Sequence, residues 1–140
     1  MQFEREFFYD EVRDGFYIPG IMKRAWGAGL TILSEIDRIC NQYDIPYYAD
    51  GGTLLGAVRN GQFIPWDDDI DIMMLRKDYD KFKEVLKEEL AKELSLYTLE
   101  TQDNHYSFLQ RYQHMMWMFI RDYFESTGNT RLLHQWIFLL

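Results

Sequence analysis

The strongest constraint in this sequence is a run of aspartates at the start of a segment in which apolar and polar residues alternate. Asp67, Asp68, Asp69 and Asp71 place four carboxylates within five residues. Four like charges this close are costly unless water or a cation neutralises them. The alternation of apolar and polar residues over 69–74 predicts a half-buried strand, which puts Asp69 and Asp71 on one face. Because Mg²⁺ prefers carboxylate and phosphate oxygens, both are candidate metal ligands and catalytic residues, with Mn²⁺ as an alternative ion.

Two other interpretations of the acidic run compete with a catalytic metal site. The aspartates could form a solvated loop that caps the next helix. They could also begin an EF-hand loop, because Asp67, Asp69 and Asp71 occupy its first, third and fifth positions. The EF-hand pattern fails at the sixth position, where Ile72 replaces glycine, and at the twelfth, where Asp78 replaces glutamate.

A Gly-Gly-Thr turn precedes the acidic run. Gly51, Gly52 and Thr53 follow a predicted strand over 45–49 and open a predicted helix over 53–59. Free backbone N–H groups at such a helix start attract anions, so we expect these three residues to bind phosphate. Thr53 could instead cap the helix, and both roles stay open. A phosphate binder and a metal binder then lie on adjacent elements.

The order of predicted elements indicates the fold class. Besides the elements above, helices are predicted over 21–43 and 78–94, and strands over 96–99 and 108–112. Helix and strand alternate, which favours an α/β (α+β) fold with a small mixed sheet and packed helices. Gly27 and Gly29 weaken the first helix, so it either starts later or packs closely against another backbone.

The chain divides into three segments. Residues 1–20 form an aromatic N-terminal extension expected to lie against the domain, and 21–112 form the core. Residues 113–140 form an apolar tail of unassigned role, most simply two helices that cover the sheet.

Charge and composition exclude several classes of function. A net charge of −8 argues against binding to a nucleic-acid backbone, which requires clustered Lys and Arg. The single cysteine, Cys40, cannot form an intramolecular disulfide, and we interpret it as a core residue. The sequence lacks a signal-peptide pattern and an apolar run long enough for a transmembrane helix. We therefore expect a cytoplasmic protein, with peripheral association at the inner membrane face left open.

Three motifs carry a resemblance to a known family. They are YADGGTLLGAVR (Tyr48 to Arg59), FIPWDDDIDI (Phe63 to Ile72) and RKDY (Arg76 to Tyr79). From about residue 30 to residue 82 the chain closely resembles the LicD family of phosphocholine and ribitol-phosphate transferases, which have the nucleotidyltransferase fold. The resemblance implies Mg²⁺-dependent transfer of a phospho-alcohol, such as phosphocholine, from a CDP-linked donor. The implied acceptor is a cell-surface glycan such as lipopolysaccharide or teichoic acid.

The remaining candidate residues have two interpretations each. Arg59 could contact the donor diphosphate or pair with the aspartates, and Trp66 could stack on the base or choline group or pack in the core. A third carboxylate is expected in this fold, but Asp103, Asp122 and Glu125 match no motif and none is assigned. The rival functions are a catalytically incomplete domain that retains metal or nucleotide binding, and a metal-dependent sugar-nucleotide glycosyltransferase.

Overall fold

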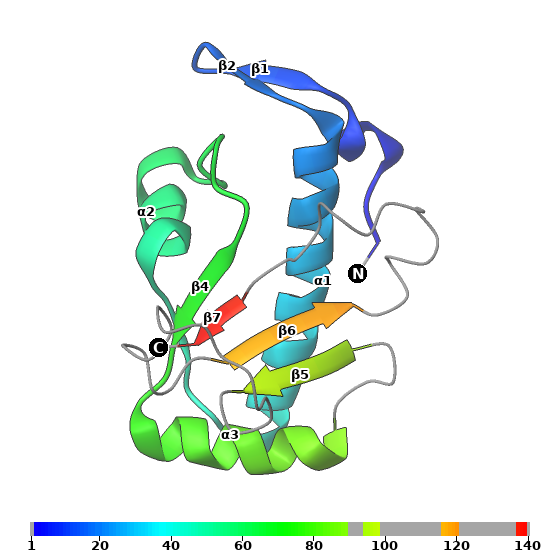
Figure 1. Ribbon diagram of the computed structural model, residues 1–140. Helices are drawn as coiled ribbons and strands as arrows, with labels where there is room; N and C mark the ends of the chain where they lie inside the picture. Colours follow the sequence, from blue (N-terminus) through cyan, green and yellow to red (C-terminus); the bar gives the residue numbers. More distant parts are fainter. Residues whose placement is uncertain (1, 90–93, 99–115, 121–136, 140) are drawn as a thin grey trace, which may run out of the picture.

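The computed structural model describes residues 2–89, 94–98, 116–120 and 137–139, and it has the predicted mixed α/β architecture (Figure 1). The described elements are η1 (Arg5–Phe8), β1 (Glu11–Arg13), β2 (Phe16–Ile18), α1 (Gly20–Tyr43), β3 (Tyr48–Ala49), α2 (Gly51–Asn60), β4 (Ile70–Met73), α3 (Arg76–Glu89), β5 (Leu94–Thr98), β6 (Met116–Ile120) and β7 (Ile137–Leu139). The hairpin of β1 and β2 was not predicted.

Helix α1 is the central support of the fold. Ile32, Ile36 and Ile39 of its apolar face are fully buried, whereas Ile21 at its first turn is 41% exposed. The helix ends at Asp44, whose left-handed φ of 51° directs the chain out of the helix. Cys40 is 2% exposed, and burial raises the pKa of its thiol to about 12, which confirms that it is a core residue.

Gly27 in α1 has a different explanation from those predicted. The helix begins at Gly20, so its start is not delayed. A Cβ on Gly27 would lie 3.1 Å from the Phe8 ring, and the ring of Phe3 is next to it. Side chains of the N-terminal extension, rather than another backbone, therefore occupy the space beside Gly27. This confirms that the extension lies against the domain.

Strand β4 is the middle strand of a three-stranded sheet with order β3-β4-β7. Strand β3 pairs with it antiparallel, and β7 pairs with it parallel, with Ile70 opposite Ile137. A separate antiparallel pair joins β5 and β6. Strands β6 and β7 lie in the segment 113–140, so the interpretation of that tail as two helices was wrong at these residues.

Helix α3 packs its buried face, Tyr79, Phe82 and Leu86, onto the same core as α1. We predicted a helix to residue 94, but Leu94 begins β5, because leucine spacing does not distinguish the end of a helix from the start of a strand. The strand predicted over 96–99 corresponds to β5, which starts two residues earlier than predicted. The strand predicted over 108–112 lies outside the described residues.

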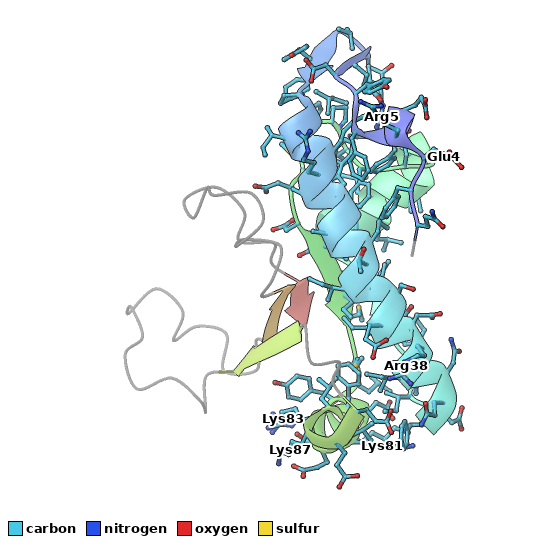
Figure 2. All side chains as sticks on the ribbon, turned by 90° about the vertical axis from the view of Figure 1, so that its right-hand side faces the viewer. Glu4, Arg5, Arg38, Lys81, Lys83 and Lys87 are labelled. Carbon is cyan, nitrogen blue, oxygen red and sulfur yellow. The ribbon has the colours of Figure 1, made fainter. Side chains whose placement is uncertain are left out.

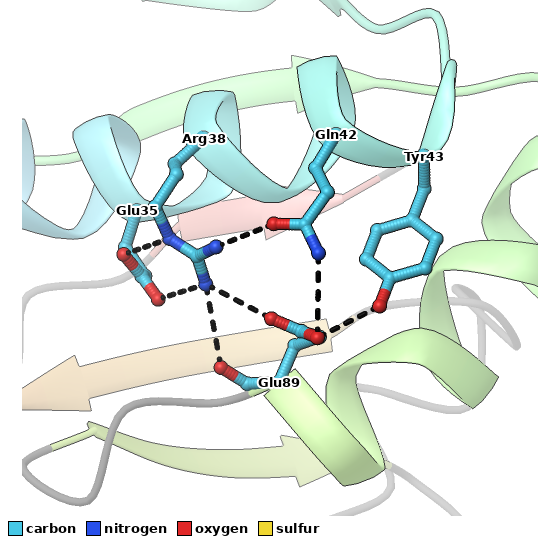
Figure 3. Close-up of polar contacts among 5 residues, drawn as sticks. All are labelled: Glu35, Arg38, Gln42, Tyr43 and Glu89. Atoms are coloured by element: carbon cyan, nitrogen blue, oxygen red, sulfur yellow. Dashed lines mark hydrogen bonds and ion pairs between the residues drawn. The ribbon is translucent and has the colours of Figure 1, made fainter.

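A polar network joins the C-terminal ends of α1 and α3 (Figure 3). Glu89 accepts a hydrogen bond from the Tyr43 hydroxyl at 2.7 Å and forms an ion pair with Arg38 at 3.4 Å. Arg38 also pairs with Glu35 at 2.8 Å. Figure 2 shows Arg38 and the lysines of α3 at the end of the molecule opposite the N-terminal extension. The network therefore fixes the end of the fold remote from the aspartates.

In the part of the chain that the structure describes, no helix is both long and apolar enough to cross a membrane.

Candidate metal and phosphate site

The acidic run lies at the start of β4, as predicted. Ile70 and Ile72 are each 1% exposed, whereas Asp71 between them is half-buried. Asp69 immediately precedes the strand and is half-buried as well. The alternation therefore anchors the aspartates to the core through their isoleucine neighbours. The same strand excludes an EF-hand, because Ile72 lies in the sheet where that loop would have to turn.

The Gly-Gly-Thr turn contacts Asp71 directly. The Gly52 N–H donates to the Asp71 carboxylate at 3.0 Å, and the Asp71 N–H donates to the Thr53 hydroxyl oxygen at 2.8 Å. The Asp50 N–H donates to the Asp71 carbonyl oxygen at 3.0 Å. The start of α2 and the start of β4 are thus adjacent, which confirms the expected pairing of the two motifs.

Glycine is required at both positions of this turn. Gly51 has a left-handed φ of 47°, and a Cβ on it would overlap the Asp71 carboxylate. A Cβ on Gly52 would overlap the Asp67 carboxylate. The two glycines therefore admit two carboxylates to the N-terminal end of α2, where the helix dipole favours negative charge.

This geometry refines the roles expected of the turn. Helix α2 begins at Gly51 with Asp50 at its N-cap, so the interpretation of Thr53 as the cap was wrong. In the described structure the Gly52 N–H holds Asp71, and the Thr53 hydroxyl accepts from the strand. Phosphate binding by Gly51, Gly52 and Thr53 stays a prediction.

The carboxyl groups of Asp67, Asp69 and Asp71 have raised pKa values. Burial, followed by the nearby charges of Asp71 and Asp67, raises the pKa of Asp69 to about 7. Burial also raises the pKa of Asp67 and of Asp71, although the Gly52 N–H opposes the shift at Asp71. The interaction between the two side chains lowers the pKa of Asp67 and raises the pKa of Asp69. A proton and a bound cation are two ways to relieve the same crowding of negative charge.

The donor set fits a hard divalent cation completed by its substrate. Within the described residues, no three His, Cys, Asp or Glu side chains are gathered so as to hold a metal ion by themselves. Mg²⁺ does not need such a cage, because it keeps several waters and binds through one or two carboxylates plus substrate phosphates. Asp69 and Asp71 supply oxygens of the required kind. The other carboxylates considered, Asp103, Asp122 and Glu125, lie outside the described residues.

The structure places the two remaining candidate residues, Arg59 and Trp66, on the surface. Arg59 is exposed on α2, and its Nε donates to the Asn60 side chain at 2.8 Å. Within residues 2–89 it forms no ion pair, so pairing with the aspartates was wrong. Trp66 is 60% exposed, which also contradicts core packing, and its ring contacts the Phe16 ring edge-on at 5.5 Å. Both side chains remain accessible to a ligand.

Sequence reasoning missed the residues that contact the acidic loop, which is the segment 61–69 between α2 and β4. Trp26 of α1 donates its indole N–H to the Asp67 carbonyl oxygen at 2.6 Å and stacks on Phe63. Arg13 of the hairpin reaches the same loop. Trp26 lies beside the apolar stripe of α1, and the bulk of a buried tryptophan was the only available signal. Arg13 carried no such signal, because its contacts with Phe63 and Trp26 are distant in sequence.

The chain is thus a mixed α/β domain in which a Gly-Gly-Thr turn at the start of one helix lies against an aspartate at the start of a strand. Comparison with known proteins identifies the family. A family model described as LicD/FKTN/FKRP, nucleotidyltransferase domain, matches residues 44–138. The chain therefore belongs to the LicD/FKTN/FKRP nucleotidyltransferase family.

Individual relatives match shorter segments. Lipopolysaccharide cholinephosphotransferase LicD of Haemophilus influenzae is 44% identical over 71 residues, which are 51% of this chain and 27% of that protein. Human ribitol 5-phosphate transferase FKRP is 47% identical over 34 residues, which are 24% of this chain and 7% of that protein. An uncharacterized protein of Rickettsia typhi is 36% identical over 55 residues, 39% of this chain and 18% of its own. The chain thus spans about a quarter or less of each relative. No solved structure matches it.

Proposed function

We propose that this chain carries the donor-binding part of an enzyme that transfers a phospho-alcohol to a glycan. The proposed donor is CDP-linked and phosphocholine-like, and the acceptor is a cell-surface glycan such as lipopolysaccharide or teichoic acid. The observation that carries the proposal is the contact between the Gly52 turn and Asp71 beside Asp69, in a chain of this family. The choice of alcohol and acceptor is supported by the name of the Haemophilus relative.

In the proposed reaction, Asp69 and Asp71 hold Mg²⁺, or Mn²⁺ in its place. When bound there, the ion would supply positive charge to neutralise the diphosphate while a glycan hydroxyl attacks the phosphorus of the phospho-alcohol and CMP leaves. The chain itself fixes the ligands: the Gly52 N–H orients the Asp71 carboxylate, and the Thr53 hydroxyl accepts from the Asp71 N–H. Phosphoryl-type transfer depends mainly on such positioning and on charge neutralisation. With its pKa raised to about 7, Asp69 is only partly ionised at neutral pH, so cation binding would be accompanied by proton release.

Trp66 and Arg59 are the proposed contacts to the rest of the donor. The exposed Trp66 ring lies next to the acidic run, where it could stack on the cytosine or on the choline cation. We propose that Arg59 contacts the diphosphate. Trp66→Ala should weaken donor binding with little change in folding stability, because the ring is largely exposed. Isothermal titration and thermal unfolding would measure these two effects.

The proposed place of action is the cytoplasm, at the inner face of the membrane. Exposed apolar side chains on α2, Leu54, Leu55 and Val58, support contact with a surface of low polarity. Binding to vesicles by sedimentation would test this, and a chain that stays in solution at all lipid concentrations would contradict it.

The alternative is a domain that binds metal and nucleotide without turnover. The segment that aligns with the Haemophilus relative is 27% of that protein. A sugar-nucleotide glycosyltransferase is disfavoured by the Gly-Gly-Thr turn ahead of the aspartates. Turnover with a glycan acceptor separates the first two functions.

The deciding experiment is calorimetric titration of CDP-choline into the protein with and without Mg²⁺. Binding that requires Mg²⁺ and is lost in Asp71→Asn supports the proposal. The matched control is Asp80→Asn, which alters an exposed carboxylate paired with Arg76 at 2.9 Å. Absence of binding with Mg²⁺ present, or unchanged binding by Asp71→Asn, would refute the donor site.

A further inference from the structure

A buried tryptophan holds the main chain of the acidic run. Trp26 is 1% exposed, and its indole N–H donates to the Asp67 carbonyl oxygen at 2.6 Å across 41 residues of sequence. The acceptor belongs to the first aspartate, two residues before Asp69. The hydrogen bond therefore connects the rigid helix α1 to the segment from which the metal-binding carboxylates project.

A second contact holds the other end of the same loop. The Phe63 ring stacks on Trp26 with centroids 4.9 Å apart and an interplanar angle of 5°. Between Phe63 and Asp67, the Asp67 N–H donates to the Ile64 carbonyl oxygen at 3.0 Å, which closes a tight turn. Trp26 thus contacts the loop at both ends of this turn, and α1 determines where the turn lies.

The N-terminal hairpin adds a third contact. The Arg13 guanidinium lies 5.5 Å from the Trp26 ring centroid, and its Nη1 donates to the Phe63 carbonyl oxygen at 3.1 Å. Glu11 pairs with Arg13 at 2.6 Å and also with Lys23 of α1. Figure 1 shows the hairpin at the end of α1 that faces the loop between α2 and β4. The extension is therefore part of the framework of the site.

We propose that Trp26 and Arg13 are positioning residues that preset the acidic loop for binding of a divalent cation. The inference rests on the proposed metal site at Asp69 and Asp71. Its physical basis is preorganisation: ligands already held in place spare the bound state the entropy of ordering a loop. The Asp67 N–H bond to Ile64 closes the turn from within, and the side chains of Trp26 and Arg13 add contacts from α1 and the hairpin.

The test compares Mn²⁺ binding, followed by electron paramagnetic resonance, in the full chain and in matched variants. Trp26→Phe keeps an aromatic ring but removes the donor, and loss of one such hydrogen bond should weaken Mn²⁺ binding about fivefold. Arg13→Met should weaken it in the same direction, and Arg13→Lys should restore part of the loss. Ile36→Val is the control, because it removes a buried methyl group from α1 but leaves the contacts of Trp26 and Arg13 with the loop in place, and should leave Mn²⁺ affinity unchanged.

Hydrogen exchange without metal provides an independent readout. Trp26→Phe should accelerate amide exchange across residues 67–71, whereas Ile36→Val should not. Mn²⁺ affinity equal to that of the unaltered chain in both Trp26→Phe and Arg13→Met would overturn this inference alone. Failure of the unaltered chain to bind Mn²⁺ would overturn the proposed metal site, and this inference with it.

Discussion

Replacing Asp69 by asparagine should stabilise the metal-free protein at alkaline pH. Asp69 has a pKa raised from the usual 3.8 to about 7 by burial and by the charges of Asp71 and Asp67. A shift of this size corresponds to at most about 4 kcal/mol. Because the side chain is only half-buried and solvent screens it, we expect a gain of about 1–2 kcal/mol in the free energy of unfolding.

The gain should depend on pH with a defined sign. The folded chain keeps the Asp69 proton up to about pH 7, whereas the unfolded chain releases it near pH 4. The contribution of Asp69 to stability is therefore fully present below about pH 4, declines as pH rises to about 7, and is constant above that. Asp69→Asn should match the unaltered protein near pH 4 and exceed it at pH 8.

Urea unfolding followed by circular dichroism in EDTA measures this difference. Asp80→Asn, the exposed control, should shift stability by less than about 0.5 kcal/mol at either pH. Mg²⁺ at ten times its dissociation constant should add about 1.4 kcal/mol to the unaltered protein and nothing to Asp69→Asn. The reasoning is wrong if Asp69→Asn is no more stable than the unaltered protein at pH 8, or if its effect is the same at both pH values.

Three further changes test the fold and the site. Gly52→Ala places a methyl group on the Asp67 carboxylate, so we expect a loss of about 1–3 kcal/mol in urea unfolding and weaker Mg²⁺ binding; unchanged stability would contradict the overlap. Phe82→Ala removes a fully buried ring and should cost about 3–5 kcal/mol in the same assay, and a cost below 1 would refute its place in the core. The pKa of Glu89 is lowered first by the Tyr43 hydroxyl, so its stabilisation is present at neutral pH and lost as pH falls. Glu89→Gln should therefore lower the melting temperature at pH 7 and leave it unchanged at pH 3; an equal loss at both would exclude the charge as the cause.

The local elements were predictable because their signals are local. The stripe of α1 and the alternation in β4 depend on side-chain spacing alone, and both elements formed within a residue or two of the predicted bounds. The end of α3 and the strands of the tail were not predictable in this way. Strand β7 pairs with β4 across more than sixty residues, and no pattern within β7 indicates its partner.

The sequence by itself determined the chemistry of the site. Aspartates alternating with isoleucines predicted a half-buried acidic strand, and the Gly-Gly-Thr turn predicted a close approach of the backbone to a neighbour, expected to be a phosphate. Only the tertiary structure decided that this neighbour is Asp71. It also decided that Trp26 and Arg13 donate hydrogen bonds to the main chain of the acidic loop. The physical reason is that side-chain periodicity reports burial within one element, whereas contacts between distant elements depend on how those elements pack.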